Sequence, residues 1–396
     1  MLKNKTVLLC VSGGIAAYKM PNLARMLKKL GAAVHVLMTR NAENFINPIT
    51  FESLTANKCI VDTFDRNFQY SVEHVALAKA ADVVMVAPAT ANVIGKLANG
   101  IADDMLTTTV MACTCKRIIA PAMNHNMYHD PIVQDNLNKL TRFGYEVIKP
   151  ATGMLANGDI GDGRLPGEGL LLEYILRVLA HEKDLSGKRL LVTAGATREA
   201  IDPVRYITNH STGRMGYAIA RAAMRRGAQV TLVSGVTAIE PPPFVKTIPV
   251  VSAEDMFEAV KAVSGEQDVI IKAAAVADYR PVVVAQNKIK KSDGNAVIEL
   301  ERTQDILGWL GAHKREGQII CGFSMETENL IENSRAKLRK KNADIIAAND
   351  LKTKGAGFGT DTNVVTIITR DAERSLEIMT KDEVADVLLD CIKEMM

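Results

Sequence analysis

The chain has 396 residues, of which 47% are hydrophobic, and it carries a formal net charge of +3. This length predicts about two to three domains with ordinary hydrophobic cores. So mild a charge gives no argument for a nucleic-acid partner, and no apolar run reaches the roughly 18 residues of a membrane helix, so we expect neither nucleic acid nor a membrane as a partner.

The N-terminal segment and the cysteines point to a cytoplasmic protein. The first apolar run, VLLCV at 7–11, is shorter than the roughly 7 residues of a signal-peptide core, and we interpret it as a strand. The six cysteines show no paired CxxC spacing of the kind that binds metals. We therefore expect reduced thiols in the cytoplasm.

The first half of the chain alternates short, β-branched apolar runs with stretches of helical periodicity. Strands are predicted at Thr6–Val11, Val34–Met38, Val83–Ala87, Arg117–Ala120 and Glu146–Ile148. Such alternation is typical of a parallel sheet covered by helices, and it predicts a doubly wound α/β domain.

The pattern begins again near the middle of the chain. GKRLLVTAGAT at 187–197 is a strand followed by a glycine turn, as NKTVLLCVSGG is at 4–14. The polar segment 181–187 follows an apolar helix and precedes the new strand, so it is the best boundary. We predict two domains, 1–185 and 186–396.

The first glycine turn, at Ser12, Gly13 and Gly14, lies where a strand passes into a helix. Unpaired N–H groups there can hold a phosphate, although an ordinary tight turn explains the piece equally well and GxGxxG is absent. Thr39 follows the second strand, and 86–109, rich in hydroxyl and amide side chains, follows the third. Polar groups at the carboxyl ends of parallel strands line a ligand crevice.

Two histidine-containing segments follow the strands of the first half. His74 precedes a helix, and its spacing alone favours a surface or capping role. PAMNHNMYHDP at 121–131 has no simple turn or helix explanation. A metal site from His125 and His129 at i, i+4 is conceivable, but the lack of nearby acidic partners makes it the weaker option. The glycine-rich segment 151–166 is either a linker or a flap over the chemistry.

The second half carries two small-residue turns and a lysine-rich loop. The segment 192–235 contains both turns, and the two could bind one polyphosphate. An ordinary dinucleotide fold is the alternative, but the GxGxxG motif that such a fold carries after its first strand is absent. In VIIKAAAVADYRP at 269–281, a very apolar strand is predicted to end in Asp278, and NKIKKSDG at 287–294 follows about ten residues later. The charge run 335–342 is by default a solvated face.

These segments together carry a family resemblance. SGGIAAYK, EHVALAKAAD, APATANVIGKLANGIADD, PAMNHNMYHDP and GMLANGDIGDGRLP resemble the flavin-dependent cysteine decarboxylases, and AAVADYRP followed by KIKK is similar to the signature of a CTP-dependent ligase. The whole chain thus resembles the bacterial bifunctional phosphopantothenoylcysteine decarboxylase/phosphopantothenate–cysteine ligases of coenzyme A biosynthesis. The resemblance implies a flavodoxin-like N-terminal flavoprotein and a Rossmann-like, nucleotide-binding ligase domain.

For the first domain, the resemblance implies an FMN site across a trimer interface. It places the phosphate near Ser12, Gly13 and Gly14 and the ring near Thr39, Thr90 and Thr107. His74 becomes a base or orienting group, Asn124 the holder of the departing carboxylate, and 151–166 a flap.

Asn157 departs from the family, which has a proton-donating cysteine at this position. A carboxamide donates a hydrogen bond but gives up no proton, so we expect the last step of decarboxylation to stall. An engineered substitution explains the residue equally well, as does a lineage that uses Asp159 or a held water as the acid.

For the second domain, the resemblance implies a CTP site with Mg2+, whose protein ligands stay unknown. The CTP residues are Ala273, Ala274, Ala275, Asp278, Lys288, Gln304, Asp305, Ile306, Leu307, Phe323, Lys337 and Lys341, and Asn209 contacts phosphopantothenate. Ser324 and Met325 replace two alanines, and an Asn-Pro before Asp305 is missing. The substrates are phosphopantothenate, cysteine and CTP, in a homo-oligomer with trimeric decarboxylase and dimeric ligase contacts, a dodecamer among the options.

Two other classes of protein stay open on the residues alone. A nicotinamide dehydrogenase predicts a dinucleotide fingerprint, which is absent. A flavin-binding regulatory protein keeps the fold without the chemistry; His74 and Asn124 argue against it, and Asn157 argues mildly for it.

Overall fold

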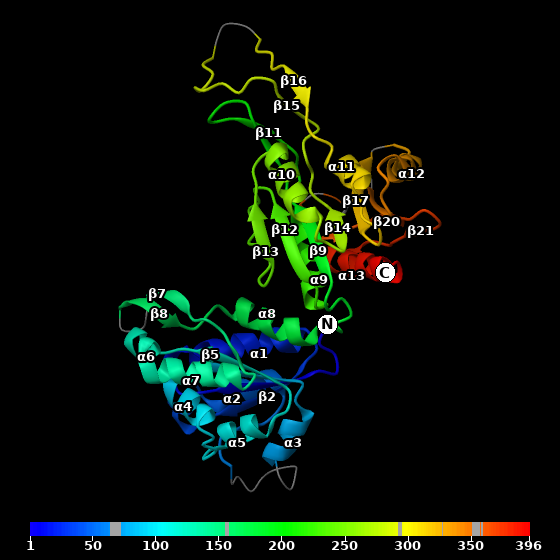
Figure 1. Cartoon of the computed structure of the whole chain (residues 1–396). Coiled ribbons are helices and arrows are strands. Elements are labelled where there is room, and N and C mark those ends of the chain that lie inside the picture. The colour runs from blue at the N-terminus through cyan, green and yellow to red at the C-terminus, as the bar shows by residue number, and fades with distance from the viewer. Residues whose placement is uncertain (64–72, 155–157, 292–294, 327, 351–356, 358) are drawn as a thin grey trace. The chain divides into compact units, whose positions relative to one another are not determined.

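The computed structural model describes residues 1–63, 73–154, 158–291, 295–326, 328–350, 357 and 359–396. The chain forms two compact units, Met1–His181 and Glu182–Met396, each described here by itself (Figure 1). The units divide a few residues before the join expected after residue 185.

The first unit is a parallel sheet with helices on both faces. Its elements are β1 Thr6–Val11, η1 Ile15–Lys19, α1 Met20–Lys29, β2 Ala33–Met38, η2 Arg40–Asn44, α2 Pro48–Thr55, β3 Cys59–Ile60, α3 Glu73–Ala80, β4 Val83–Ala89, α4 Ala91–Ala98, α5 Met105–Ala112, β5 Lys116–Pro121, α6 His125–His129, α7 Pro131–Arg142, β6 Glu146–Val147, β7 Ala151–Met154, β8 Ile160–Arg164 and α8 Glu168–Leu179. The six-stranded sheet has the order β3-β2-β1-β4-β5-β6.

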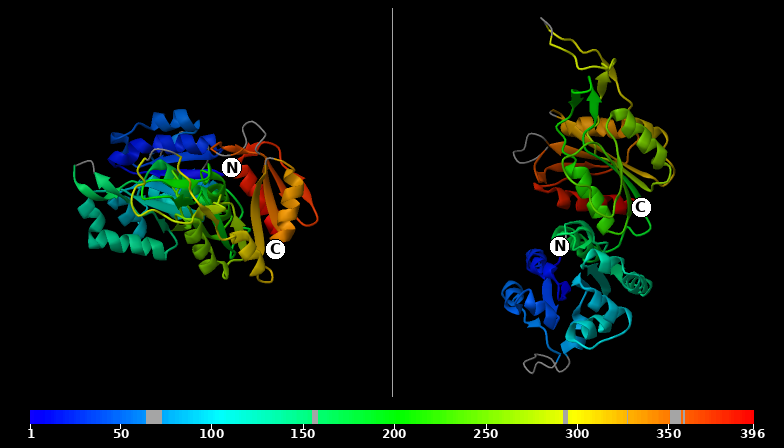
Figure 2. Two further views of the ribbon diagram at one scale, coloured as in Figure 1. Left: turned by 90° about the horizontal axis from the view of Figure 1, so that it is seen from above. Right: turned by 90° about the vertical axis from the view of Figure 1, so that its left-hand side faces the viewer.

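Alternate residues of the central strands enter two separate cores. In β1, Leu9 and Val11 pack with α1 and α8, whereas Leu8 and Cys10 pack with α4 and α7. Figure 2 shows these helices on the two faces of the sheet. Burial on both faces explains why the strands are apolar without alternation, as expected for parallel strands.

The doubly wound α/β architecture predicted for this unit is confirmed, and all five predicted strands are present. The strand order is 3-2-1-4-5-6, however, rather than the 2-1-3-4-5 order of flavodoxin itself. The strand β3 was not predicted, because a strand of only two residues, Cys59–Ile60, shows no periodicity in the sequence.

The glycine-rich segment 151–166 contains an antiparallel hairpin, β7–β8, and not a plain linker. Asn157 lies outside the described residues, between the two strands of this hairpin.

The second unit repeats the plan with a larger sheet. Its elements are β9 Arg189–Ala194, β10 Arg198–Ala200, β11 Tyr206–Thr208, α9 Arg214–Arg225, β12 Gln229–Ser234, β13 Lys246–Pro249, α10 Ala253–Ser264, β14 Val269–Lys272, β15 Tyr279–Pro281, β16 Leu300–Arg302, α11 Ile306–Ala312, β17 Ile319–Glu326, α12 Leu330–Lys340, β18 Ile345–Asp350, β19 Thr362–Asn363, β20 Val365–Ile368, β21 Glu373–Ser375, β22 Met379–Thr380 and α13 Lys381–Glu394. The main sheet has the order β13-β12-β9-β14-β17-β18-β20-β21. The first six strands are parallel, and β20 and β21 are antiparallel. One face packs on α9 and α13 and the other on α10, α11 and α12.

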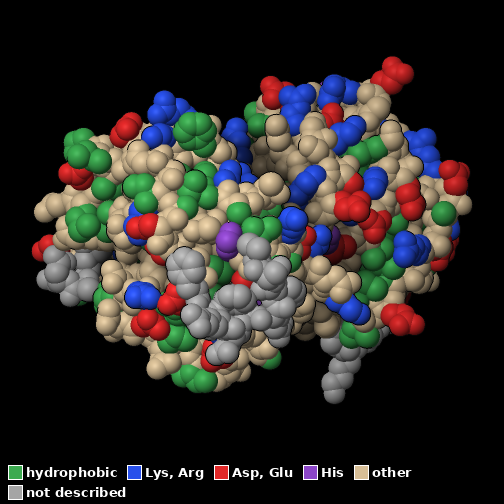
Figure 3. All heavy atoms as spheres, turned by 90° about the horizontal axis from the view of Figure 1, so that it is seen from below, with side chains coloured by type: hydrophobic (Ala, Val, Ile, Leu, Met, Phe, Trp, Pro, Cys, Tyr) green, Lys and Arg blue, Asp and Glu red, His purple; other side chains and the backbone are tan. Residues whose placement is uncertain are grey.

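The surface has a mixed character. On the face shown in Figure 3, Lys and Arg side chains are interspersed with Asp and Glu, in keeping with the small net charge of +3. Within the described ranges, no helix combines the length and the apolar character that crossing a bilayer requires.

Candidate functional site

Two adjoining cavities open at the carboxyl ends of the strands in the first unit. One has a volume of about 710 Å³ and the other about 600 Å³. Both are lined by Gly13, Thr90, Ala91 and Met127; Gly14 and Asn124 line the larger, and Thr39 the smaller. This is the edge at which doubly wound sheets bind ligands.

Ser12 ties the glycine turn between β1 and η1 to the end of β4. Its hydroxyl donates to the Pro88 carbonyl at 2.6 Å and accepts from the Thr90 N–H at 3.0 Å. At Gly13, a Cβ would lie 2.5 Å from the Cβ of Asn41, so only glycine fits. The hydroxyl proton of Ser12 is therefore used inside the protein, and the turn offers a ligand its backbone.

The three threonines predicted beside the ring differ in their surroundings. Thr90 lines both cavities. The hydroxyl of Thr39 is buried and has no hydrogen-bond partner within the described part of the chain. Thr107 lines neither cavity, because its hydroxyl donates to the Asp104 carboxylate at 2.8 Å in the capping box of α5.

These cavities fit a flavin mononucleotide. A buried hydroxyl without a partner is rare in folded proteins, and a ligand beside Thr39 would supply that partner. The tight turn at Gly13, followed directly by the short helix η1, suits a phosphate. The lining of the larger cavity is mostly apolar, as a planar ring requires.

Asn124 presents its amide group to the larger cavity. It is the N-cap of α6, and its side-chain oxygen accepts the N–H of Asn126 at 2.9 Å. Because the cap uses the oxygen, the NH2 group is the part left to donate to a ligand carboxylate.

The β7–β8 hairpin forms one wall of the larger cavity. Gly163 accepts the Met123 N–H at 3.0 Å, and Arg164 lines the cavity. Gly163 has φ +123°, and a Cβ there would lie 2.2 Å from the Met123 carbonyl oxygen, so the position requires glycine.

His74 lies in the first turn of α3, half-buried, and lines neither cavity. Within one chain, the structure does not bring it to the same cavity as Asn124.

A third cavity, of about 370 Å³, opens at the carboxyl ends of the strands in the second unit. Seven predicted CTP residues line it: Asp278, Gln304, Asp305, Ile306, Leu307, Lys337 and Lys341. Lys341 forms an ion pair with Asp305, and Lys337 donates to the Phe323 carbonyl at 3.1 Å. Burial opposes ionisation of Asp305, but the bond from Lys341 still holds the pKa of that carboxyl below its usual range. Lys337 and Lys341 are thus half-buried in the lining of a cavity and do not lie on a fully solvated face.

The strand β14 ends at Lys272 and not at Asp278, where its end was predicted. Lys272 also lines this cavity, and sequence reasoning missed it together with Arg302 and Thr303. Burial lowers the pKa of Lys272 to about 8, and the charge of Lys337 acts in the same direction. A lysine at the carboxyl end of an apolar parallel strand was the signal that could have identified it.

The remaining predicted ligase residues lie outside the lining of the third cavity. The Ala274 N–H donates to the Thr193 hydroxyl of β9 at 3.1 Å, and the Ala275 N–H donates to the Gly195 carbonyl in the glycine turn at 3.0 Å. The Ala275 carbonyl accepts from Asn209 at 3.3 Å. Lys288 is exposed, next to Ile289, whose N–H donates to the buried Asp202 carboxylate at 3.1 Å.

The two halves of the chain match two family models. Residues 1–180 match the Flavoprotein family, and residues 185–396 match the family described as DNA/pantothenate metabolism flavoprotein C-terminal domain.

Full-length relatives are similar over almost the whole chain. The coenzyme A biosynthesis bifunctional protein CoaBC of Bacillus subtilis is 50% identical over 393 residues, which cover 98% of this chain and 97% of that protein. The Escherichia coli protein of the same name is 40% identical over 392 residues, with 98% and 97% covered. A solved C-terminal domain of a CoaBC protein has 48% identity and a TM-score of 0.47, covering 54% of this chain and 98% of its own. The chain therefore belongs to the family of bifunctional coenzyme A biosynthesis proteins.

Proposed function

We propose that this chain makes 4′-phosphopantetheine in two steps, each in one domain. The second domain joins 4′-phosphopantothenate to cysteine with CTP, and the first domain decarboxylates the cysteine moiety with FMN. The observation that carries the proposal is the buried Thr39 hydroxyl, which has no partner among the described residues. It lies at the smaller of two adjoining cavities, both of which contain the glycine turn, and the larger contains the Asn124 amide. The cationic cavity of the second domain supports the ligase step.

The ligase step needs activation of a carboxylate, which by itself is a poor acyl donor. The carboxylate attacks the α-phosphorus of CTP, giving an acyl-cytidylate and pyrophosphate; the cysteine amine then displaces CMP and forms the amide. Lys288 offsets charge on the leaving pyrophosphate, since a compact ammonium suits phosphate. Mg2+, when bound with CTP, would add positive charge there. Lys337 and Lys341, which line the cavity, hold the nucleotide phosphates. The parallel strands of the second domain, β13-β12-β9-β14-β17-β18, have the order 3-2-1-4-5-6 when numbered along the chain. This order supports a Rossmann-like, nucleotide-binding domain.

The decarboxylase step needs a place for electrons before CO2 can leave. FMN, when bound, supplies the acceptor for the two electrons of the thiol oxidation. The Asn124 amide N–H group orients the departing carboxylate, and His74 acts as a base or orienting group at the substrate.

Because His74 lines neither cavity of its own chain, a neighbouring copy supplies it in our proposal. A site shared between copies agrees with the trimer expected for the decarboxylase domain. We propose that the ligase domains make dimeric contacts in the same homo-oligomer. The enzyme then works in the cytoplasm, where its six cysteines stay reduced; none of them forms a disulfide.

Asn157 replaces the acid of the family, and its structure lies outside the described residues. General acid catalysis contributes about 10²- to 10⁴-fold, so its loss raises the barrier of the final protonation by roughly 3 to 5 kcal/mol. We propose that CO2 leaves and that the ene-thiol accumulates, because the flavin, when bound, would keep the two electrons that the stalled last step returns to the product.

The proposal is tested on the purified chain and on Lys288→Gln. The wild-type chain should be yellow, with a flavin spectrum, and should release pyrophosphate with CTP and Mg2+ but far less with ATP. Lys288 is exposed, so Lys288→Gln should keep the melting temperature while pyrophosphate release falls steeply. A colourless chain, equal use of ATP, or full pyrophosphate release by Lys288→Gln would each contradict the assignment of its domain.

A further inference from the structure

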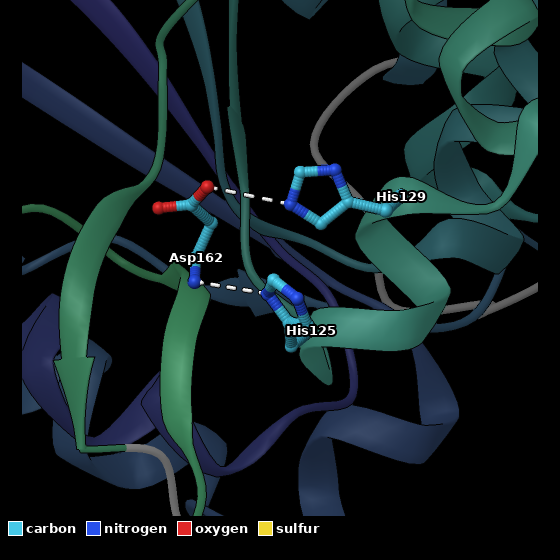
Figure 4. A group of neighbouring side chains, drawn as sticks. All are labelled: His125, His129 and Asp162. Carbon is cyan, nitrogen blue, oxygen red and sulfur yellow. Dashed lines mark hydrogen bonds and ion pairs between the residues drawn. The ribbon is translucent and has the colours of Figure 1, made fainter.

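Two histidines and an aspartate meet where the β7–β8 hairpin packs on α6. His125 and His129 lie on α6 and Asp162 on β8, and one possible ligand atom from each lies within 4.8 Å of the others. Figure 4 shows both imidazole rings beside Asp162, with interactions to its side chain and its backbone nitrogen. None of the three residues lines either neighbouring cavity.

The distances are close to those of a metal site. His129 Nε2 lies 3.3 Å from Asp162 Oδ2. Bonds of about 2.0–2.2 Å to a tetrahedral zinc place two ligand atoms about 3.3 Å apart. The ring centroids of His125 and His129 lie 4.5 Å apart. A small movement of the His125 ring would therefore bring it to a metal bound by His129 and Asp162.

His125 already offers the lone pair that a metal needs. Its Nδ1 accepts the Asp162 N–H at 3.1 Å. A neutral imidazole has a single lone pair in the ring plane, so a cation at Nδ1 would replace this hydrogen bond. At Gly161, a Cβ would lie 2.6 Å from His125 Nδ1, so the glycine lets the hairpin come this close.

The carboxylate is oriented and the site is open to solvent. The Thr152 hydroxyl donates to Asp162 Oδ1, which leaves Oδ2 facing His129. The side chains of His129 and Asp162 are 49% and 28% exposed, so a cation can enter from water. Such outer hydrogen bonds are typical of metal-ligating carboxylates.

We propose that His125, His129 and Asp162 bind a divalent transition metal of the zinc class, with water in a fourth position. Two imidazoles and one carboxylate suit zinc, cobalt or nickel, whereas Mg2+ and Ca2+ take oxygen ligands. The cation ties the β7–β8 hairpin to α6, whose N-cap is Asn124. None of the three ligands has a chemical role in the proposed reactions, and the cation is not their Mg2+.

Calorimetric titration of the purified, flavin-loaded full chain with Zn2+, without CTP, tests the site. We expect one micromolar site per chain, lost in His129→Gln and in Asp162→Asn. Thr152→Val should weaken binding about 10- to 100-fold, because it removes only the outer hydrogen bond. His313→Gln, in the other unit, and Asp135→Asn, exposed on α7, are matched controls that should bind as the wild type does.

Co2+ substitution identifies the ligands. We expect a four- or five-coordinate spectrum without thiolate-to-metal absorption, and its disappearance in His129→Gln. Unchanged Zn2+ affinity in His129→Gln and Asp162→Asn, no binding at micromolar Zn2+, or a spectrum with thiolate ligands would overturn the proposal. Flavin absorption of each variant shows that the domain is folded.

Discussion

Lys272 gives the nucleotide cavity a cation whose charge changes close to physiological pH. Burial lowers its pKa from 10.5 to about 8 in the nucleotide-free chain, whereas a bound polyphosphate favours the charged ammonium. CTP binding should therefore take up a proton near pH 8 and above, and its affinity should fall by at most about tenfold per pH unit between pH 8 and 10.5. The folding stability of the nucleotide-free chain has the opposite pH dependence. Because the pKa of Lys272 is lower in the folded chain than in the unfolded chain, Lys272 adds to the free energy of unfolding as the pH rises through the same interval.

Calorimetry of CTP binding in buffers of different ionisation enthalpy measures that proton uptake. Lys272→Met keeps the length of the side chain and should abolish the uptake. Persistence of the same uptake in Lys272→Met would assign it to another group.

The unpaired hydroxyl of Thr39 predicts opposite effects on the apo and loaded chains. Thr39→Val removes a buried hydroxyl that has no partner among the residues the structure describes, so the flavin-free chain should be as stable as the wild type or slightly more so. FMN affinity should fall about 2- to 12-fold, the equivalent of one lost hydrogen bond of roughly 0.5–1.5 kcal/mol. Melting curves and flavin-fluorescence titration give the two values; unchanged FMN affinity would mean that Thr39 does not contact the flavin.

Some residues of the candidate sites could be predicted from sequence motifs, and others are recognised only from the structure. Asp278 and residues 304–307 were predicted from a motif, and the structure brings them to one cavity. Lys272 was missed because it lies just before the AAVADYRP motif, although its place at the end of an apolar strand was a usable signal. Thr107 was predicted beside the ring, but its hydroxyl is in the α5 capping box, and no sequence pattern separates a capping threonine from a ligand-binding one.

Among the elements, the predictable ones are those buried on both faces. The apolar runs of β1 and β4 predict these strands nearly to the residue, because a parallel strand between two helix layers has no polar position. The β7–β8 hairpin could not be predicted in this way. Gly161 and Gly163 are required by close contacts with the distant His125 and Met123, which no local pattern encodes.

The hairpin wall of the cavity depends on Gly163. Gly163→Ala places a Cβ against the Met123 carbonyl at a φ that favours glycine, so the hairpin should move away from the loop that carries Asn124. We expect decarboxylation to fall at least about tenfold while CTP-dependent ligation stays unchanged, since a 1 Å misplacement can cost about 10²-fold. CO2 release and pyrophosphate release, assayed separately, test this.

Gly167→Ala is the matched control, because a Cβ there meets nothing within 4 Å. Equal decarboxylase activity in the two variants would show that the position of the hairpin does not matter for the reaction.

For the whole molecule, the separation of His74 from the Asn124 cavity predicts sites shared between copies. His74→Asn and Asn124→Ala should each be inactive as decarboxylases. Co-expressed in equal amounts, they should regain about a quarter of wild-type activity, the fraction of interfaces at which both intact residues meet in a cyclic oligomer. Activity no higher than that of either variant alone would place the complete site within one chain.

The most direct test of the two-step account is one coupled assay with phosphopantothenate, cysteine and CTP, followed for pyrophosphate, CO2 and phosphopantetheine. The account predicts CTP-dependent pyrophosphate over many turnovers and CO2 only after ligation. It also predicts little phosphopantetheine until Asn157→Cys restores the acid. CO2 without CTP, or pyrophosphate without any CO2, would contradict the two linked reactions, and multiple turnovers to phosphopantetheine that Asn157→Cys does not improve would contradict the stall.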